Sequence, residues 1–145
     1  MPADVPQPSS PHPARDLLQA SGGAAQEGAG SLRAAVANAM VGLKKKYYGR
    51  GPDAAKAWFL DDYVFVAMEG GLTPDEETLL ADGKADLVRS YRLSFQETMS
   101  QTTTGAIEEL TGRKVLSYHS QIVFDPARSF EIFVLAPERE PDAPS

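Results

Sequence analysis

The chain has 145 residues, of which 42% are hydrophobic and 23% charged, and its formal net charge is −6. This length suits one ordinary domain rather than two, and the composition is that of a globular protein rather than a disordered one. Because the sequence contains no cysteine, disulfides, thiolate nucleophiles and cysteine-ligated metal centres are excluded. The negative charge also disfavours a domain that binds nucleic acid over its whole surface.

The two ends differ in composition from the middle of the chain. Residues 1–30 are rich in proline, glycine, alanine and serine and contain few large apolar side chains. Such a segment cannot bury enough surface to offset its ordering entropy, so we predict a disordered leader over 1–30 and a disordered tail over the proline-rich residues 137–145. A single α+β domain is expected over 31–136. With neither a signal pattern nor a run of about 18 apolar residues, we expect a cytoplasmic protein without a membrane segment.

The first predicted element is a helix that begins at Ser31, a favourable N-cap residue. Apolar residues then follow at spacings of three and four, which predicts an amphipathic helix of about 17 residues. Gly49 and the Gly51-Pro52 pair are expected to end it. The apolar stripe consists of Leu32, Ala35, Val36, Ala39, Met40, Leu43 and Tyr47.

A hairpin is predicted next, over residues 55–68. Both of its halves are aromatic and β-branched, which favours strands. Asp61-Asp62 separates them, and aspartate tolerates the geometry of a tight turn.

A strong helix start follows, in which Thr73 is the cap, Pro74 takes the first helical position and Glu76 completes a capping box. The apolar stripe then continues to Leu110. One helix over 74–111 would be unusually long for so small a domain, so we expect a break or bend at Gly83 or in the polar run 101–105.

A second hairpin is predicted from residues 114–124 and 129–135. Placing Phe124 opposite Phe130 and Ile122 opposite Ile132 gathers the large residues on one face, together with Tyr118 and Leu116. The other face then holds Ser117, His119, Gln121, Val123, Phe133 and Leu135. A half-apolar second face predicts a homodimer or another protein contact.

The expected fold class is therefore α+β. Two hairpins form a four-stranded, mostly antiparallel sheet, packed on one face by two to three helices in the order α-ββ-α(α)-ββ.

The first candidate site is the segment Lys44–Pro52, in which cations alternate with aromatic residues and glycines. Tyr48, Arg50, Gly51 and Pro52 are its candidate binding residues, since the glycines let a ligand approach the backbone. Alternatively, the lysines complement the helix dipole and Tyr47 completes the core stripe. The spacing matches neither a P-loop nor a dinucleotide fingerprint.

The second candidate is the pair Arg89 and Arg92, which are neighbours on one helix face and suit an anion clamp. The alternative is a solvated face with a salt bridge from Arg89 to Asp86. His119 has no fixed nucleophile or metal ligand beside it in sequence, and we interpret it as a polar side chain on the protein surface. The adjacent carboxylates lack the contrasting environments that acid–base catalysis needs. We therefore predict no catalytic residue, no metal and no cofactor, and do not expect an enzyme.

The order and spacing of several motifs resemble those of the MpsC family. The motifs are Tyr47 to Pro52, Asp61-Asp62, Gly71 to Glu76, Glu108 to Val115, Asp125-Pro126 and Glu131 to Leu135. This resemblance implies a component of a Na⁺-translocating, membrane-potential-generating system and a cytoplasmic partner of membrane transport machinery. It brings no catalytic residues.

The leading hypothesis is a non-enzymatic accessory or regulatory protein that acts through protein contacts as a homodimer. Two alternatives stay open. One is a sensor of a small anionic ligand that uses Arg50 with Arg89 or Arg92. The other is an RNA contact through the basic segment Lys44–Arg50, for which binding should fall steeply with salt.

Overall fold

The computed structural model describes residues 24–138. The chain divides into two compact units, Met1–Leu32 and Arg33–Ser145, and the fold described below is that of the second. Helix α2, Ala24–Tyr48, runs through both units. The other elements are β1 Ala54–Leu60, β2 Tyr63–Glu69, α3 Pro74–Ala81, α4 Ala85–Thr98, α5 Ser100–Thr111, β3 Val115–Val123 and β4 Arg128–Leu135.

The start of α2 corrects one prediction. The helix begins at Ala24, so the boundary predicted at Ser31 comes too late and the predicted disorder is wrong for residues 24–30. Alanine has the highest helix propensity. Ala24, Ala25 and Ala29 therefore favour a helix even though this segment has no large apolar side chain to bury. The rest of the predicted leader, and all but Pro137 and Glu138 of the predicted tail, lie outside the described residues.

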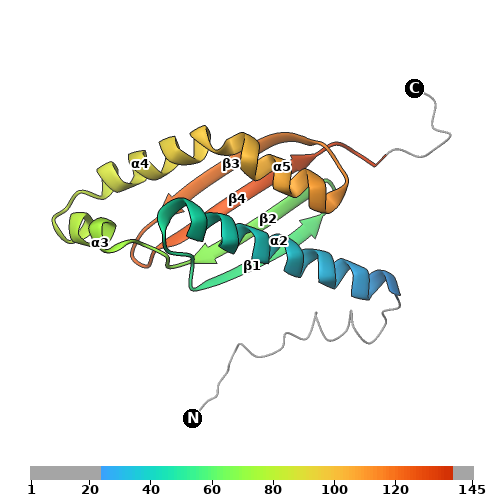
Figure 1. Ribbon diagram of the computed structural model, residues 1–145, viewed down its shortest axis with the longest axis horizontal. Coiled ribbons are helices and arrows are strands. Elements are labelled where there is room, and N and C mark those ends of the chain that lie inside the picture. The colour runs from blue at the N-terminus through green and yellow to red at the C-terminus, as the bar shows by residue number, and fades with distance from the viewer. Residues whose placement is uncertain (1–23, 139–145) are drawn as a thin grey trace, which may run out of the picture. The chain divides into compact units, whose positions relative to one another are not determined.

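The four strands form one antiparallel sheet in the order β1-β2-β4-β3, which confirms the predicted fold class. Within residues 33–138, α2, α4 and α5 lie on the same face of the sheet (Figure 1). The core fills the space between this face and the helices. Its most completely buried apolar residues are Val36, Met40, Val64, Val66, Met68, Val88, Ile107, Ile122, Phe133 and Leu135.

The first hairpin has its predicted form. Leu60 pairs with Tyr63 across the turn, and Asp61 takes a positive φ of 54°, a conformation that aspartate adopts more readily than most residues. The capping box is also confirmed, with the Thr73 side chain bound to the Glu76 amide and the Glu76 side chain to the Thr73 amide.

The helical region breaks twice. Gly83, with a φ of 76°, separates α3 from α4, as predicted. A second break occurs at Met99, between α4 and α5, whereas the polar run 101–105 lies within α5.

The register of the second hairpin was predicted wrongly. Ile122 lies opposite Ser129, and Phe130 lies opposite Gln121. Strand β4 therefore turns its other side to the helices: Ser129, Glu131, Phe133 and Leu135 are buried, while Phe130 is 39% exposed. The reason is Glu131. Its charged side chain is 0% exposed and forms an ion pair in the core, which keeps this side of β4 toward the helices.

Leu116 was also misplaced, because it is 57% exposed instead of buried. The pairing of β3 with β4 shifts between Val115 and Ser117. Such a bulge leaves one residue out of the regular alternation, and here that residue is Leu116.

Candidate functional site

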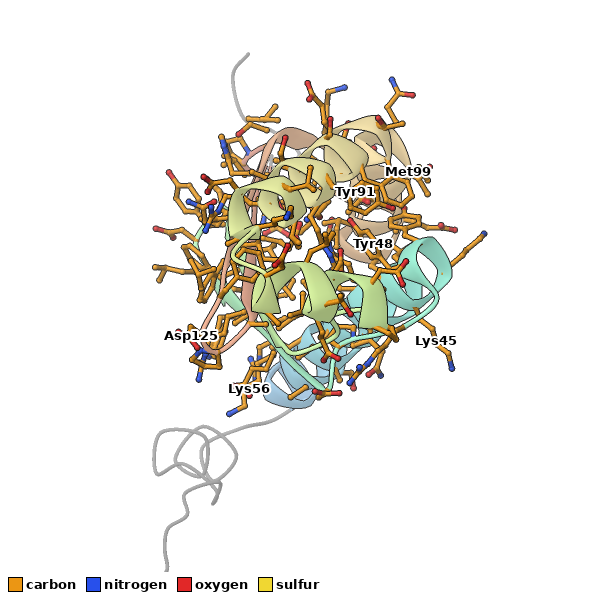
Figure 2. All side chains as sticks on the ribbon, turned by 90° about the vertical axis from the view of Figure 1, so that its left-hand side faces the viewer. Lys45, Tyr48, Lys56, Tyr91, Met99 and Asp125 are labelled. Atoms are coloured by element: carbon orange, nitrogen blue, oxygen red, sulfur yellow. The ribbon has the colours of Figure 1, made fainter. Side chains whose placement is uncertain are left out.

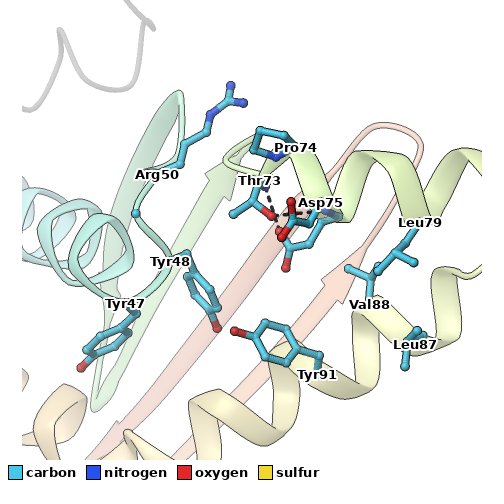
Figure 3. Close-up of a pocket in the computed structure, with 12 residues that line it drawn as sticks. Tyr47, Tyr48, Arg50, Thr73, Pro74, Asp75, Leu79, Leu87, Val88 and Tyr91 are labelled. Atoms are coloured by element: carbon cyan, nitrogen blue, oxygen red, sulfur yellow. Dashed lines mark hydrogen bonds between the residues drawn. The ribbon is translucent and has the colours of Figure 1, made fainter.

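A pocket of about 620 Å³ lies where the C-terminal end of α2 meets α3 and the first half of α4 (Figure 3). Three tyrosines and three aliphatic residues form most of its wall, and polar residues of the α2–β1 loop and the α3 N-terminus form its rim. The wall consists of Tyr47, Tyr48, Tyr91, Leu79, Leu87 and Val88, and the rim of Gly49, Arg50, Thr73, Pro74, Asp75 and Glu76.

The end of the α2 stripe positions the tyrosines. Tyr48 packs edge-on against Phe95, with ring centroids 5.1 Å apart, and against Tyr91 at 6.3 Å. The Tyr47 hydroxyl lies 3.3 Å from the Thr103 hydroxyl. Figure 2 shows Lys45 pointing away from the domain while Tyr48 and Tyr91 approach each other. The helix therefore ends with its aromatic side toward α4.

A buried ion pair lies behind the pocket. Arg92, 4% exposed, donates to both carboxylate oxygens of Glu76, at 2.7 and 2.6 Å, and to the Gly71 carbonyl oxygen at 3.0 Å. Its guanidinium carbon lies 3.9 Å from the centre of the Tyr48 ring. Burial raises the pKa of Glu76, but hydrogen bonds from Arg92 and Thr73 outweigh it, so the pKa lies below its usual value. Arg92 is thus neutralised within the domain.

A second buried cluster is centred on Glu131, whose Oε2 accepts hydrogen bonds from Lys44 Nζ and Ser120 Oγ, both at 3.1 Å. Its Oε1 accepts a short hydrogen bond from the Tyr118 hydroxyl. Gln96 Oε1 accepts a short bond from Lys44 and lies 3.0 Å from the Tyr118 hydroxyl. The carboxylate therefore receives donors from α2 and from β3, which satisfies a charge that burial alone would make very costly.

Burial shifts the titration of this cluster. Desolvation lowers the pKa of Lys44 even though Glu131 opposes the shift. Burial and the charge of Glu131 raise the pKa of Tyr118. A second pocket, of about 500 Å³ between α4, α5 and β3, includes Gln96, Tyr118 and Ser120 in its wall. The cluster is therefore a core element that borders this second pocket.

Arg50 lies at the mouth of the first pocket. It is 44% exposed and lies 3.5 Å from Asp53 and 4.0 Å from Glu77, and its Nη1 donates to the Leu72 carbonyl oxygen at 3.0 Å. These contacts fasten the α2–β1 loop to the start of α3. Arg50, a candidate binding residue from the sequence, is thus near the pocket, but it already has anionic partners.

Gly51 and Pro52 have packing roles. A Cβ on Gly51 would lie 3.3 Å from the Lys45 Cβ, and a Cβ on Gly71, where φ is 85°, would lie 3.0 Å from the Pro52 Cα. The glycines thus let chain segments approach one another, whereas the sequence had suggested an approach for a ligand. Neither Gly51 nor Pro52 lines the pocket.

The structure does not bring Arg89 and Arg92 together as one anion clamp. Arg89 Nη1 bonds Asp86 at 3.0 Å, the salt bridge named as the alternative, and its guanidinium carbon lies 5.2 Å from the centre of the Phe124 ring. Arg92 instead faces Glu76. The two side chains therefore serve different parts of the fold.

The sheet face opposite the helices carries exposed large apolar side chains. Trp58, Leu60, Tyr63 and Phe130 are 47%, 63%, 44% and 39% exposed. The strand register places Trp58, Phe65, Ile132 and His119 in one row across the sheet, and Leu60, Tyr63, Val134 and Ser117 in the next. We call these eight residues the open-face rows.

The half-apolar second face that the sequence predicted is thus present, but with other members. Ser117, His119, Gln121 and Val123 lie on it as expected, with His119 Nε2 3.0 Å from Ser117 Oγ. Phe133 and Leu135, assigned to it earlier, are in the core, 0% and 1% exposed. The wrong register exchanged the two sides of β4.

The sequence reasoning missed the buried roles of Lys44 and Glu131. A signal for each was present. Lys44 follows Val36 and Met40 at four-residue spacing on the apolar stripe, and Glu131 lies between Phe130 and Ile132 in the mostly apolar second half of the hairpin. A charged residue at a core-facing position of each element was the available signal.

Within residues 24–138, no helix is both long and apolar enough to cross a membrane. No group of three histidine, aspartate or glutamate side chains in the same range could hold a metal ion.

These features define a class of protein: a small α+β domain with one helix-covered sheet face, one open apolar face and two neutralised charge pairs inside. The family described as "Na⁺-translocating membrane potential-generating system (MpsC)" matches residues 29–137. The chain therefore belongs to the MpsC family, as its motifs had suggested.

Two relatives come from Bacillus subtilis strain 168. One, "Uncharacterized protein YbcI", is 26% identical over 118 residues, which cover 77% of this chain and 90% of the relative. The other, "Uncharacterized protein YrhF", is 26% identical over 94 residues, covering 63% of this chain and 77% of the relative. No solved structure matches the chain significantly.

Proposed function

We propose that this protein is a non-enzymatic accessory or regulatory domain that acts through protein contacts as a homodimer. The observation that carries the proposal is the apolar open face of the sheet. The family description supports a place in a Na⁺-translocating, membrane-potential-generating system, and we propose that the domain serves such a system from the cytoplasm.

The size of the open face suits a protein partner. Four strands of about seven residues cover a plane of roughly 450 Å², given strand spacings of about 4.8 Å and a rise of about 3.3 Å per residue. Protruding side chains raise the accessible area above that of the plane. A standard interface buries about 800 Å² on each partner, so the two areas are of the same order.

The charge distribution favours a second copy as that partner. The open-face rows contain no carboxylate, lysine or arginine; Lys56 lies in the neighbouring row with Phe130, and Arg128 and Glu69, 3.5 Å apart, lie in the row beyond. Uncharged rows do not repel their own copy, and an isologous contact requires a self-complementary patch. Two sheets packed face to face would bury the exposed Trp58 and Leu60 together.

Light scattering coupled to size exclusion tests the homodimer. We expect a mass of twice the 15.6 kDa of one chain, and a single-chain mass for Leu60→Lys, which places a charge in the interface. Leu87→Lys is the matched control, because Leu87 is 54% exposed on α4, on the helix side. A single-chain mass for the wild type at high concentration would rule out the dimer.

The accessory role is tested by purification from native membranes. We expect a Na⁺-translocating membrane protein to copurify with the wild-type chain. Recovery of the chain without any such protein, under mild detergent and low salt, would remove the transport assignment.

Both alternative functions have less support. An anion sensor would need free guanidinium groups, yet Arg50, Arg89 and Arg92 all have carboxylate partners. The basic segment proposed for RNA loses Lys44, which is 4% exposed and paired with Glu131.

A further inference from the structure

We propose that the pocket between α2, α3 and α4 binds a small, neutral aromatic molecule that carries a hydrogen-bond acceptor. Its volume of about 620 Å³ lies within the range of roughly 300–1,000 Å³ that is usual for small-molecule sites. This site is separate from the open sheet face, so the inference does not depend on the proposed homodimer.

The walls of the pocket favour an aromatic ring. Tyr48 and Tyr91 meet at an interplanar angle of 67°, and Leu79 and Val88 line the same space. Figure 3 shows the hydroxyl ends of the two tyrosines directed toward each other inside the pocket. Tyr91 and the neighbouring Leu87 are 53% and 54% exposed. A ring that inserts here gains edge-to-face contacts with tyrosine and covers apolar surface.

The Tyr48 hydroxyl calls for an acceptor. Its oxygen is buried and, within the described part of the chain, has no hydrogen-bond partner. Burial raises the pKa of Tyr48, so the group keeps its proton and is available as a donor. Buried polar groups without a partner are rare in folded proteins. A carbonyl oxygen or ring nitrogen of a ligand would supply the missing bond.

The charges around the pocket favour a neutral ligand. Arg92 is committed to Glu76, and Arg50 to Asp53 and Glu77, while Asp75 on the rim opposes an anion. A cation is disfavoured as well, because the Arg92 guanidinium and the Lys44 ammonium already lie 3.9 and 5.9 Å from the centre of the Tyr48 ring.

Three probes with the same ring separate these charge classes: benzamide is neutral with a carbonyl acceptor, benzoate is an anion and benzylamine a cation. Each is titrated into the ¹⁵N-labelled full chain and followed by heteronuclear NMR. We expect saturable shifts of pocket amides, among them Gly49, Thr73 and Val88, with benzamide. Affinity should be at least tenfold lower for the two charged probes. Equal or tighter binding of benzoate or benzylamine would overturn the neutral class.

Two variants test the assigned residues. Tyr48→Phe removes only the partnerless hydroxyl, and we expect about a fivefold loss of benzamide affinity, the factor that one ordinary hydrogen bond provides. Leu79→Trp fills the pocket and should abolish saturable shifts there. Tyr63→Phe, on the open sheet face, is the control and should bind as the wild type does. Unchanged binding by Tyr48→Phe, or no saturable shift of pocket amides with wild type, would refute the site.

Discussion

The two faces of the sheet contrast with the usual distribution of charge. The covered face holds Glu131 and receives Lys44 from α2, both nearly inaccessible to water. The open face instead presents Trp58, Leu60 and Tyr63, each more than 40% exposed. Charge is tolerated inside because each group has a partner and enough donors, whereas apolar surface outside has no such compensation within residues 33–138. The two charges of the covered face are thus paired within the domain, whereas the open face leaves its apolar side chains available to the partner that we propose.

The largest expected effect comes from leaving one buried charge alone. Glu131→Leu removes the charged acceptor of Lys44 and leaves it only the neutral Gln96 oxygen. We expect a loss of about 3–5 kcal/mol in the free energy of unfolding, the usual cost of breaking a buried pair. Lys44→Met combined with Glu131→Leu should restore most of it, since no unpaired charge remains. Urea denaturation of the two single variants and the double variant gives the comparison.

This first prediction has a pH signature. An unpaired buried lysine resists protonation, so its pKa falls even further below 10.5 than in the wild type. Between that lowered pKa and 10.5 the unfolded chain binds more protons, so the stability of Glu131→Leu should rise with pH. Should Glu131→Leu be as stable as the wild type at pH 7, the pair would contribute nothing to the covered face.

Two phenylalanines three positions apart on β4 provide the next test. Phe133, 0% exposed and stacked on Tyr118 with centroids 4.8 Å apart, lies on the covered face, and Phe130 on the open one. Phe133→Ala should cost about 3–5 kcal/mol, and Phe130→Ala about 1 kcal/mol in the monomer, because less apolar area leaves contact. Thermal and urea unfolding at low protein concentration measure both. Equal losses would mean that the two faces do not differ as described.

Local features of the fold could be predicted from the sequence, but the register of β4 could not. The Asp61-Asp62 turn and the Thr73 capping box depend on residues within a few positions of one another, and both were predicted correctly. The register of β4 depends on Lys44, 87 residues away from Glu131. The position of each charge among apolar residues is a local signal, but local sequence does not reveal that the two side chains meet in the core.

The candidate site was predictable only in part, for a related reason. Tyr48 and Arg50 lie at the pocket because Tyr48 is the last residue of α2 and Arg50 follows it in the loop, and the stop signal at Gly49 and Gly51-Pro52 places this helix end in the sequence. That Arg92 faces Glu76 rather than a ligand depends on how α3 folds back on α4 at Gly83. Spacing along one helix does not contain this information.

Lowering the pH tests the ion pair between Glu76 and Arg92. The folded-state pKa of Glu76 lies below 4.5, so its contribution to stability is present above 4.5 and is lost as pH falls through the folded pKa. We expect Glu76→Gln to be less stable than the wild type at neutral pH. As the pH falls below 5, the variant should lose less free energy of unfolding than the wild type does. Urea denaturation across this pH range measures it, with Glu77→Gln, more than half exposed, as the control. Parallel pH curves for wild type and Glu76→Gln would contradict the assigned role of the Arg92 pair.

The smallest effect should come from Lys46, which lies on α2 two positions after Lys44. Lys46 is exposed, so Lys46→Met should change the free energy of unfolding by no more than about 0.5 kcal/mol. Lys44→Met strands the Glu131 carboxylate in the core and should cost several times more. Because both substitutions remove one positive charge from the last turns of α2, the helix dipole and the net charge change alike. Any difference in urea denaturation between them therefore measures the burial of Lys44, and similar midpoints would show that its charge remains in contact with water.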